Sequence, residues 1–268
     1  LDGVSVWDLV LISRHILGIQ PFDSPYKLIA ADANHSGTIT SFDIVELRKL
    51  LLGTYTQLPN NTSWRFIDAG QIFSVPENPF ADSIRETIVV HHLTADMTNA
   101  NFVGVKTGDT DISIMPQVAA APDDRTSPLQ LKVEDRPIYA GETITVTLSI
   151  PAIVHAIQMI FSANDMEIEQ TGGLPEENWA LTSDAVALAC EHPLVAPLTV
   201  QVKALRSGWL SDFLRITNEI TTSRAFDING TSYPIELHFV SGKNAARPGF
   251  YLYPNQPNPF AADTRIWF

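Results

Sequence analysis

The chain has 268 residues, a formal net charge of −13 at pH 7 and a hydrophobic fraction of 45%. This length favours two domains over one. The acidic balance argues against a nucleic-acid partner, because phosphate-binding surfaces need clustered Lys and Arg. No apolar run reaches the roughly eighteen residues that a membrane-spanning helix needs. The one cysteine, Cys190, excludes an internal disulfide, and its apolar neighbours predict a small core residue.

The chain opens on "LDGVSVWDLV", inside what we expect to be a structured element. We therefore expect this start to be a cut, so that the lack of a signal peptide gives no information about the compartment.

Two segments predict a repeated helix. "DLVLISRHILG" and "DIVELRKLLLG" carry apolar residues at helical spacing, and each ends in Gly, a common helix stop. Aligned on Asp8 and Asp43, they match with a constant offset of 35 residues, which pairs Gly18 with Gly53. One short helix cannot bury its apolar face alone, but two related helices can bury theirs against each other. The repeat therefore predicts a paired loop–helix module.

The stretch "DANHSGTITSFD", residues 32–43, precedes the second helix and has the spacing of a calcium loop. Calcium prefers six to eight oxygen ligands, which alternate positions of a tight loop can supply. Gly37 permits the sharp turn. The candidate ligands are the side chains of Asp32, Asn34 and Ser36, the carbonyl of Thr38, Thr40 directly or through water, and Asp43. The alternative is that Asp43 only caps the helix, where the helix dipole favours its charge without metal.

The corresponding first loop, "LDGVSVWD", does not follow the standard ligand spacing. The sequence leaves calcium binding there open. Asp2 and Asp8 are candidates for capping and turn formation alone.

These paired segments, the second with its calcium loop, resemble a type I dockerin domain over residues 1–55. The resemblance implies an antiparallel helix pair that calcium holds together and that docks onto cohesin modules. The implied recognition positions are Ser41 and Phe42 in the second repeat and Val6 and Trp7 in the first. Such positions are often small or hydroxylated in the family. We therefore expect the large Trp7 and Phe42 to pack within the chain, including by intramolecular docking, with an external protein partner as the alternative.

After residue 55 the composition of the chain changes twice. Residues 56–125 are turn-rich and predict a connector with short strands. Residues 126–242 carry short β-branched and aromatic runs between turn signals, which predict a mainly antiparallel β-sandwich. The opening "LQLKVEDRPIYAGETITVTLSI" resembles immunoglobulin- or cohesin-like sandwiches in architecture. The expected fold is therefore multidomain: a small all-α calcium-loop helix pair followed by a β-sandwich.

The last residues, 247–268, contain "YLYPNQPNPFAADTRIWF" and resemble the start of a type IX secretion sorting domain. The residues that carry this resemblance are Asn255, Pro257, Asn258, Pro259 and Phe260, followed by Thr264, Ile266 and Phe268. The resemblance implies export by the type IX machinery to the cell surface or the medium.

Catalytic signatures are missing from the sequence. It has no G-x-S-x-G, P-loop or G-x-G-x-x-G motif. We expect His91 and His92 to be neighbours on a strand, pointing to opposite faces rather than to one metal. Trp179 and Trp209 are candidate glycan contacts, although their apolar surroundings predict core positions.

The sequence therefore predicts a non-catalytic C-terminal region of a secreted or surface-displayed bacterial protein. It would hold a structural Ca²⁺ ion and act in adhesion or extracellular assembly, such as a surface layer or filament, through a protein partner or self-assembly. The alternative is an accessory or carbohydrate-binding region of a secreted hydrolase whose catalytic domain lies upstream.

Overall fold

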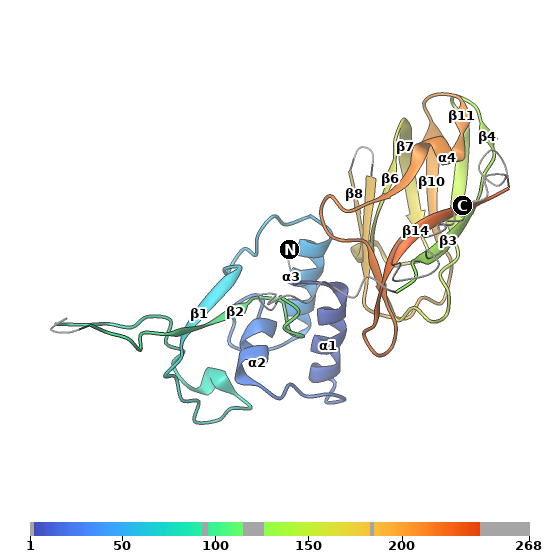
Figure 1. Cartoon of the computed structure of the whole chain (residues 1–268). Coiled ribbons are helices and arrows are strands. Elements are labelled where there is room, and N and C mark those ends of the chain that lie inside the picture. Colours follow the sequence, from blue (N-terminus) through green and yellow to red (C-terminus); the bar gives the residue numbers. More distant parts are fainter. Residues whose placement is uncertain (1–2, 93–95, 115–125, 183–184, 242–268) are drawn as a thin grey trace, which may run out of the picture.

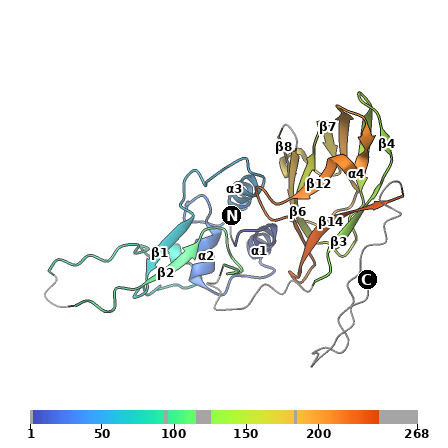
Figure 2. The same ribbon diagram turned by 45° about the horizontal axis from the view of Figure 1, so that its top comes forward.

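A computed structural model describes residues 3–92, 96–114, 126–182 and 185–241. Three helices near the N-terminus lie between a small two-stranded sheet and a larger β-rich domain, in both views of the chain (Figure 1, Figure 2). Within the described ranges, no helix is long and apolar enough to cross a membrane. The arrangement places the helices in contact with both sheet regions.

The first three helices are α1 (Val6–Ile16), α2 (Pro25–Ala31) and α3 (Ser41–Leu51), which we call the helical module. The helices α1 and α3 are the predicted pair. Each begins with a capping box, formed by Ser5 with Asp8 and by Thr40 with Asp43, which satisfies backbone N–H groups at the helix start. Their facing apolar side chains are buried together in one cluster, which includes Leu9, Ile12, Leu47 and Leu51.

The small sheet pairs β1 (Trp64–Asp68) with β2 (Phe102–Lys106) in antiparallel register. Its inner face packs on α2, where Ile67 and Val105 contact the cluster of Ile29 and Ala30. A short 3₁₀ turn, η1 (Pro79–Ala81), lies in the connection between the two strands. After β2, the Gly108 N–H donates to the Ala30 carbonyl at 2.8 Å, which carries the following residues back toward the helices.

The β domain contains β3 to β14, arranged in two larger sheets and one separate strand pair. The larger has the order β3-β14-β13-β6-β9-β8 with β12 paired to β6, and the smaller has the order β5-β10-β7. A separate pair joins β11 and β4, and β14 pairs with β3 in parallel. The elements are β3 (Leu129–Glu134), β4 (Pro137–Ile138), β5 (Thr143–Leu148), β6 (Ala156–Ala163), β7 (Met166–Gly172), η2 (Glu176–Asn178), β8 (Trp179–Leu181), β9 (Ala185–Cys190), β10 (Leu198–Ala204), β11 (Gly208–Trp209), α4 (Leu210–Phe213), β12 (Leu214–Thr217), β13 (Arg224–Phe226) and β14 (Ser232–Val240).

The core of the β domain lies between the two sheets. Alternate residues of β5, such as Ile144 and Val146, point into it and leave their neighbours exposed, as the period of a strand dictates. Cys190 and Trp179 belong to the same core, as predicted, whereas Trp209 is half-buried.

The expectation of a strand at His91 and His92 is wrong. Both side chains are exposed, in a segment without regular structure. Among the described residues, neither histidine therefore has a sheet partner that would direct the two rings to opposite faces.

Strands β6 and β9 differ from β5 because both of their faces are covered. All eight residues of β6 are buried. The side chains that point away from the β-domain core, among them Ala156 and Ile160 of β6 with Ala187 and Ala189 of β9, join the apolar cluster of α1 and α3 instead. The outer face of this sheet is thus the surface on which the helical module lies.

Candidate docking interface and metal centre

The N-terminus of α1 is bonded to the β domain. The Val6 N–H is one of the groups that a helix start leaves without an intrahelical acceptor. It donates to Oε1 of Gln158 on β6 at 2.6 Å, and both groups are buried. The Gln158 amide donates in turn to Oγ1 of Thr221 and to the Thr222 carbonyl, each at 2.8 Å. Gln158 thus caps a helix that begins 152 residues earlier in the chain.

Trp7 is the largest side chain in this contact. Its ring stacks on Phe226 of β13 with centroids 6.1 Å apart, and only 6% of the residue is exposed. A Cβ on Gly230 would lie 2.6 Å from the indole, so the turn after β13 accepts the ring only because it has no side chain there. The Arg14 guanidinium lies 5.0 Å from the ring centroid and donates to the Ile228 carbonyl. This burial agrees with the expected packing of Trp7 within the chain.

The C-terminal end of α3 contacts the same surface. Arg48 forms an ion pair with the buried Glu191, which directly follows β9. Among the described residues, Nε of Arg48 and Oε2 of Glu191 are buried without a hydrogen-bond partner. The ion pair is therefore the main polar contact that replaces water for these two side chains. Gly53 lies so close to Ile220 that a Cβ would approach its side chain to 2.8 Å. The N-terminal end of α1 and the C-terminal end of α3 therefore both contact the β domain.

The C-terminal end of α1 and the N-terminal end of α3 expose several apolar side chains. Phe42 is 71% exposed and Leu17 is 70% exposed, and Ile19 and Ser41 are also exposed. The expected packing of Phe42 within the chain is therefore wrong. Phe42 is the second residue of α3, and the described residues leave most of its side chain uncovered.

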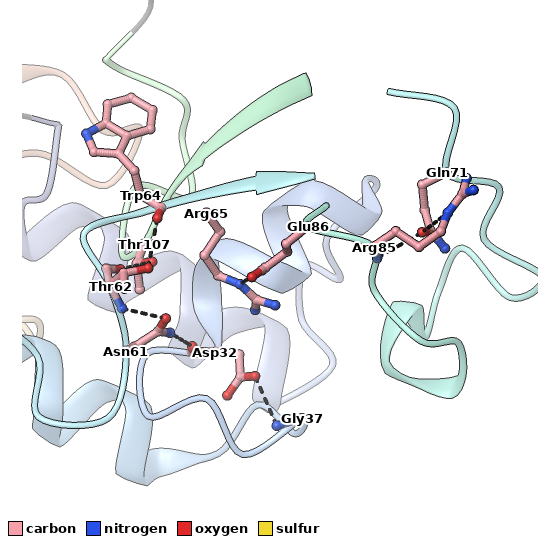
Figure 3. Close-up of polar contacts among 10 residues, drawn as sticks. All are labelled: Asp32, Gly37, Asn61, Thr62, Trp64, Arg65, Gln71, Arg85, Glu86 and Thr107. Atoms are coloured by element: carbon pink, nitrogen blue, oxygen red, sulfur yellow. Dashed lines mark hydrogen bonds and ion pairs between the residues drawn. The ribbon is translucent and has the colours of Figure 1, made fainter. Parts of the chain in front are cut away.

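The loop before α3 brings the predicted calcium-ligand residues together. Asp32 is fully buried, and its Oδ1 accepts from the Ser36 N–H at 2.8 Å. Its Oδ2 accepts from the Gly37 N–H at 3.0 Å (Figure 3). The Asn61 amide donates to the Asp32 carbonyl at 2.8 Å (Figure 3). The Asn34 N–H donates to Oδ1 of Asp43 at 3.1 Å, so the two ends of the loop meet. The residues that the sequence spacing singled out therefore lie together in one turn.

Two further predicted ligands complete this loop. The Thr40 N–H donates to Oδ2 of Asp43 at 2.8 Å, and Oγ of Ser36 donates to the Thr38 carbonyl at 3.1 Å. Burial, and next the nearby Asp32 charge among the raising effects, lifts the pKa of Asp43 above its usual value. The loop thus holds two buried acids, Asp32 and Asp43, together with the oxygen atoms of the other predicted ligands. This donor set fits a hard divalent cation, which would balance both charges.

A second acidic cluster lies at the start of α1, and the sequence analysis missed two of its members. Carboxylate oxygens of Asp8, Asp109 and Asp111 lie within 4.8 Å of one another. Burial raises the pKa of Asp8 to about 8, and the neighbouring Asp111 charge adds to the effect. Burial also raises the pKa of Asp111 to about 6. The segment "DTDIS", residues 109–113, carried a signal, since it has the alternating acids that start a calcium loop.

Other predicted site residues fall elsewhere. The sorting-motif residues Asn255, Pro257, Asn258, Pro259 and Phe260 lie outside the described residues. Trp179 lies in the core and Trp209 is half-buried, so neither forms an exposed aromatic platform for a glycan.

Comparisons with known proteins support the helical module. Residues 2–52 match the family model of the dockerin type I domain. Domains of this family are non-catalytic and typically bind calcium. Among solved structures, the chain is similar to the solution structure of CaCohA2 from Clostridium acetobutylicum, with 12% identity and a TM-score of 0.28, over 42% of this chain and 92% of that one. No curated protein matches the chain.

Proposed function

We propose that this chain is a non-catalytic assembly region of a secreted or surface-displayed protein, in which a calcium-stabilised docking module is bound in cis to a β-sandwich. The observation that carries the proposal is the covered outer face of β6 and β9. Trp7 and the N-terminus of α1 dock there through a capping glutamine and an apolar cluster. A surface built to receive a helix pair is a docking surface, and here the same chain supplies both partners.

Calcium would act as a structural clip in this account. The residues that would hold it are Asp32, Asn34, Ser36, Thr38, Thr40 and Asp43, at the start of α3. The ion would supply positive charge to two buried carboxylates and fix the loop from which α3 begins. A cation that binds only the folded state stabilises it by mass action. Calcium would therefore keep α1 and α3 in the relative position that docking needs.

The exposed apolar side chains at the C-terminal end of α1 and the N-terminal end of α3 support a second candidate function, an external protein partner. Phe42 occupies the repeat position of Trp7, and Leu17 occupies that of the buried Leu52. Exposed apolar side chains grouped on one surface mark interaction sites. We infer that this end takes a sheet face of the kind that covers α1, namely one with small apolar side chains and a side-chain acceptor for a helix N–H. Such a module would link two β-sandwiches in an extracellular assembly.

Export rests on the tail motif and on the docking module. The residues from Asn255 to Phe260 resemble a type IX sorting signal, and calcium is plentiful outside the cell. The alternative role, an accessory region of a secreted hydrolase, would retain the same docked architecture and add a catalytic domain upstream.

The test uses the matched pair Trp7→Ala and Phe42→Ala in the full chain. If docking in cis holds the two regions together, Trp7→Ala gives the helical module and the β domain separate unfolding transitions, as followed by urea denaturation with circular dichroism and amide exchange. Phe42→Ala keeps the transitions as they are in the wild type. Equal behaviour of the two variants would contradict the proposal.

A further inference from the structure

Strand β5 forms one edge of the smaller sheet of the β domain. The order of this sheet is β5-β10-β7, and among the described residues β5 pairs with β10 alone. Its sequence, TITVTL, is β-branched at every position but the last, a composition that suits strand pairing. With six residues the strand has ordinary length, so its outer edge is one to which a further strand can add.

The backbone groups on this outer edge follow from the bonding at the start of β5. The Ala204 N–H of β10 donates to the Glu142 carbonyl at 2.9 Å. Bonded residues alternate along an antiparallel pair, so Ile144 and Val146 also direct their backbone groups to β10. The residues whose N–H and C=O groups point away from β10, and which have no backbone partner in the described part of the chain, are Thr143, Thr145 and Thr147.

A groove of about 500 Å³ runs beside this edge. Residues 143–147 line one side of it, and Val133 of β3 and Leu210 of α4 contribute to the other. Because every residue from 143 to 147 borders the groove, the described chain leaves this length of the edge uncovered.

Three other edge strands carry features that discourage pairing. Strand β7 exposes Glu167 and Glu169, and its register shifts opposite Gln201. Strand β3 exposes Lys132 and Glu134, and β8 has only three residues. Charges, irregular register and short length are common means of protecting a sheet edge. Strand β5 has no charged residue and no proline, and its register with β10 is regular.

The β5 edge is complementary to itself. In an antiparallel pair of two copies centred on Thr145, this residue lies opposite Thr145 of the second copy, and Thr143 lies opposite Thr147. These are the residues whose backbone groups point outward, so each pair can exchange N–H···O bonds. The same register sets Ile144 opposite Val146, and both belong to the inner face of the sheet. Threonine therefore meets threonine along the exposed face, a favourable cross-strand pairing.

Charge also favours a second copy as the partner. The net charge of −13 makes two copies repel each other over much of their surfaces. Residues 143–149 contain no acidic or basic side chain. The adjacent acid, Glu142, is paired with Arg136 at 2.8 Å. The β5 edge is thus a neutral strip along which two copies can approach.

We propose that β5 pairs with β5 of a second copy about a two-fold axis at Thr145, which joins the two smaller sheets into one continuous sheet. This inference goes beyond docking in cis and needs neither calcium nor the helical module. The helical module packs on the outer face of β6 and β9, in the larger sheet, so the two contacts use different sheets. Each chain would therefore carry a self-association edge in addition to its docked module.

The test measures the mass of the full chain by sedimentation equilibrium over a wide range of concentration. The wild type is expected to pass from the monomer mass to the dimer mass as the concentration rises. Thr145→Pro removes the central outward N–H, at an edge position where proline leaves the bonds to β10 intact. It is expected to raise the dissociation constant of the dimer by about tenfold or more.

A charge exchange tests the two-fold register. Thr145→Lys and Thr145→Glu each place like charges opposite each other, so each variant alone is expected to be monomeric. An equimolar mixture of the two places opposite charges together and is expected to regain the dimer. Gln201→Lys is the matched control, because Gln201 lies opposite Thr145 on β10, away from the edge, and it should dimerise like the wild type.

Each outcome bears on the β5 edge. A wild type that stays monomeric would overturn the proposal, as would a dimer that survives both Thr145→Pro and Thr145→Lys. A mixture of the two charged variants that stays monomeric would overturn the two-fold register. A dimer lost in Trp7→Ala but kept in the Thr145 variants would place self-association at the docking surface instead. Circular dichroism verifies that each variant is folded.

Discussion

Trp7 and Phe42 occupy equivalent positions in two helical repeats 35 residues apart, yet Trp7 is 6% exposed and Phe42 is 71% exposed. The difference lies in what covers them, because the β domain packs on the end of the module that carries Trp7. The pair therefore gives an internal control for docking.

Truncating these two residues should have unequal effects on stability. Trp7→Ala removes a buried ring and is expected to lower the free energy of unfolding by about 3–5 kcal/mol. Phe42→Ala changes an exposed side chain and is expected to stay within about 0.5 kcal/mol of the wild type. Urea unfolding of both variants measures the difference, and a loss at Phe42 as large as that at Trp7 would be incompatible with the described interface.

Gly230 provides a steric test of the same contact. It has a φ of +87°, and an added Cβ would lie 2.6 Å from the Trp7 indole. Gly230→Ala is expected to destabilise the chain by about 1–3 kcal/mol more than Gly18→Ala, because overpacking adds to backbone strain. Gly18 is the matched control, with a φ of +69° and no atom near its Cβ position. Thermal unfolding compares the two, and equal losses would mean that Trp7 does not press on this turn.

The ion pair between Arg48 and Glu191 should matter more than a surface pair. Arg48→Met leaves a buried carboxylate without its partner, which is expected to cost about 3–5 kcal/mol. Arg206→Met breaks a pair with Asp165 in which both side chains are more than half exposed, and is expected to cost less than about 1 kcal/mol. Denaturant midpoints of the two variants test this. Near-equal midpoints would mean that the pair of Arg48 and Glu191 does not stabilise the interface.

The Cys190 thiol should resist modification while the β domain is folded. Burial raises the pKa of this thiol, so the folded state holds less of the reactive thiolate at a given pH than the unfolded chain does. We expect iodoacetamide to label Cys190 slowly in buffer at pH 8 and rapidly in concentrated urea, as measured by mass spectrometry. Equal labelling rates in the two solvents would argue against its core position.

Removing calcium should loosen the helical module. At a concentration one hundredfold above the dissociation constant, one ion contributes about 2.7 kcal/mol. Chelator is therefore expected to lower the melting temperature of the module, and Asp32→Asn should lower it in calcium and reduce the chelator effect. A melting curve that chelator does not shift would exclude a structural ion in the loop that ends at Asp43.

The sequence was sufficient for elements with local signals. The helices α1 and α3 follow from apolar periodicity and terminal glycines, and the strands of the β domain from alternating runs and turns. Docking is different, because contacts such as that of Val6 with Gln158 join residues 152 apart. A signal for it existed in "AIQMIFSA" and "AVALAC", whose continuous apolar runs are typical of strands covered on both faces. Those runs do not reveal which element provides the cover.

The candidate metal sites show the same limit. The loop that ends at Asp43 is contiguous, so its spacing could be recognised directly. The acidic cluster of Asp8, Asp109 and Asp111 could not, because Asp109 and Asp111 follow Asp8 by about 100 residues in the chain. Only the return of the chain from β2, fixed in part by the bond from Gly108 to Ala30, brings these acids close to Asp8.

The central claim is that the helical module docks on the β domain of its own chain, and a double-mutant cycle between Trp7 and Phe226 tests it most directly. The rings stack across 219 positions of sequence, so coupling between them reports the interface itself. The account predicts that Trp7→Ala and Phe226→Ala are coupled by about 0.5–1.5 kcal/mol in urea unfolding. Additive effects of the two substitutions would contradict it.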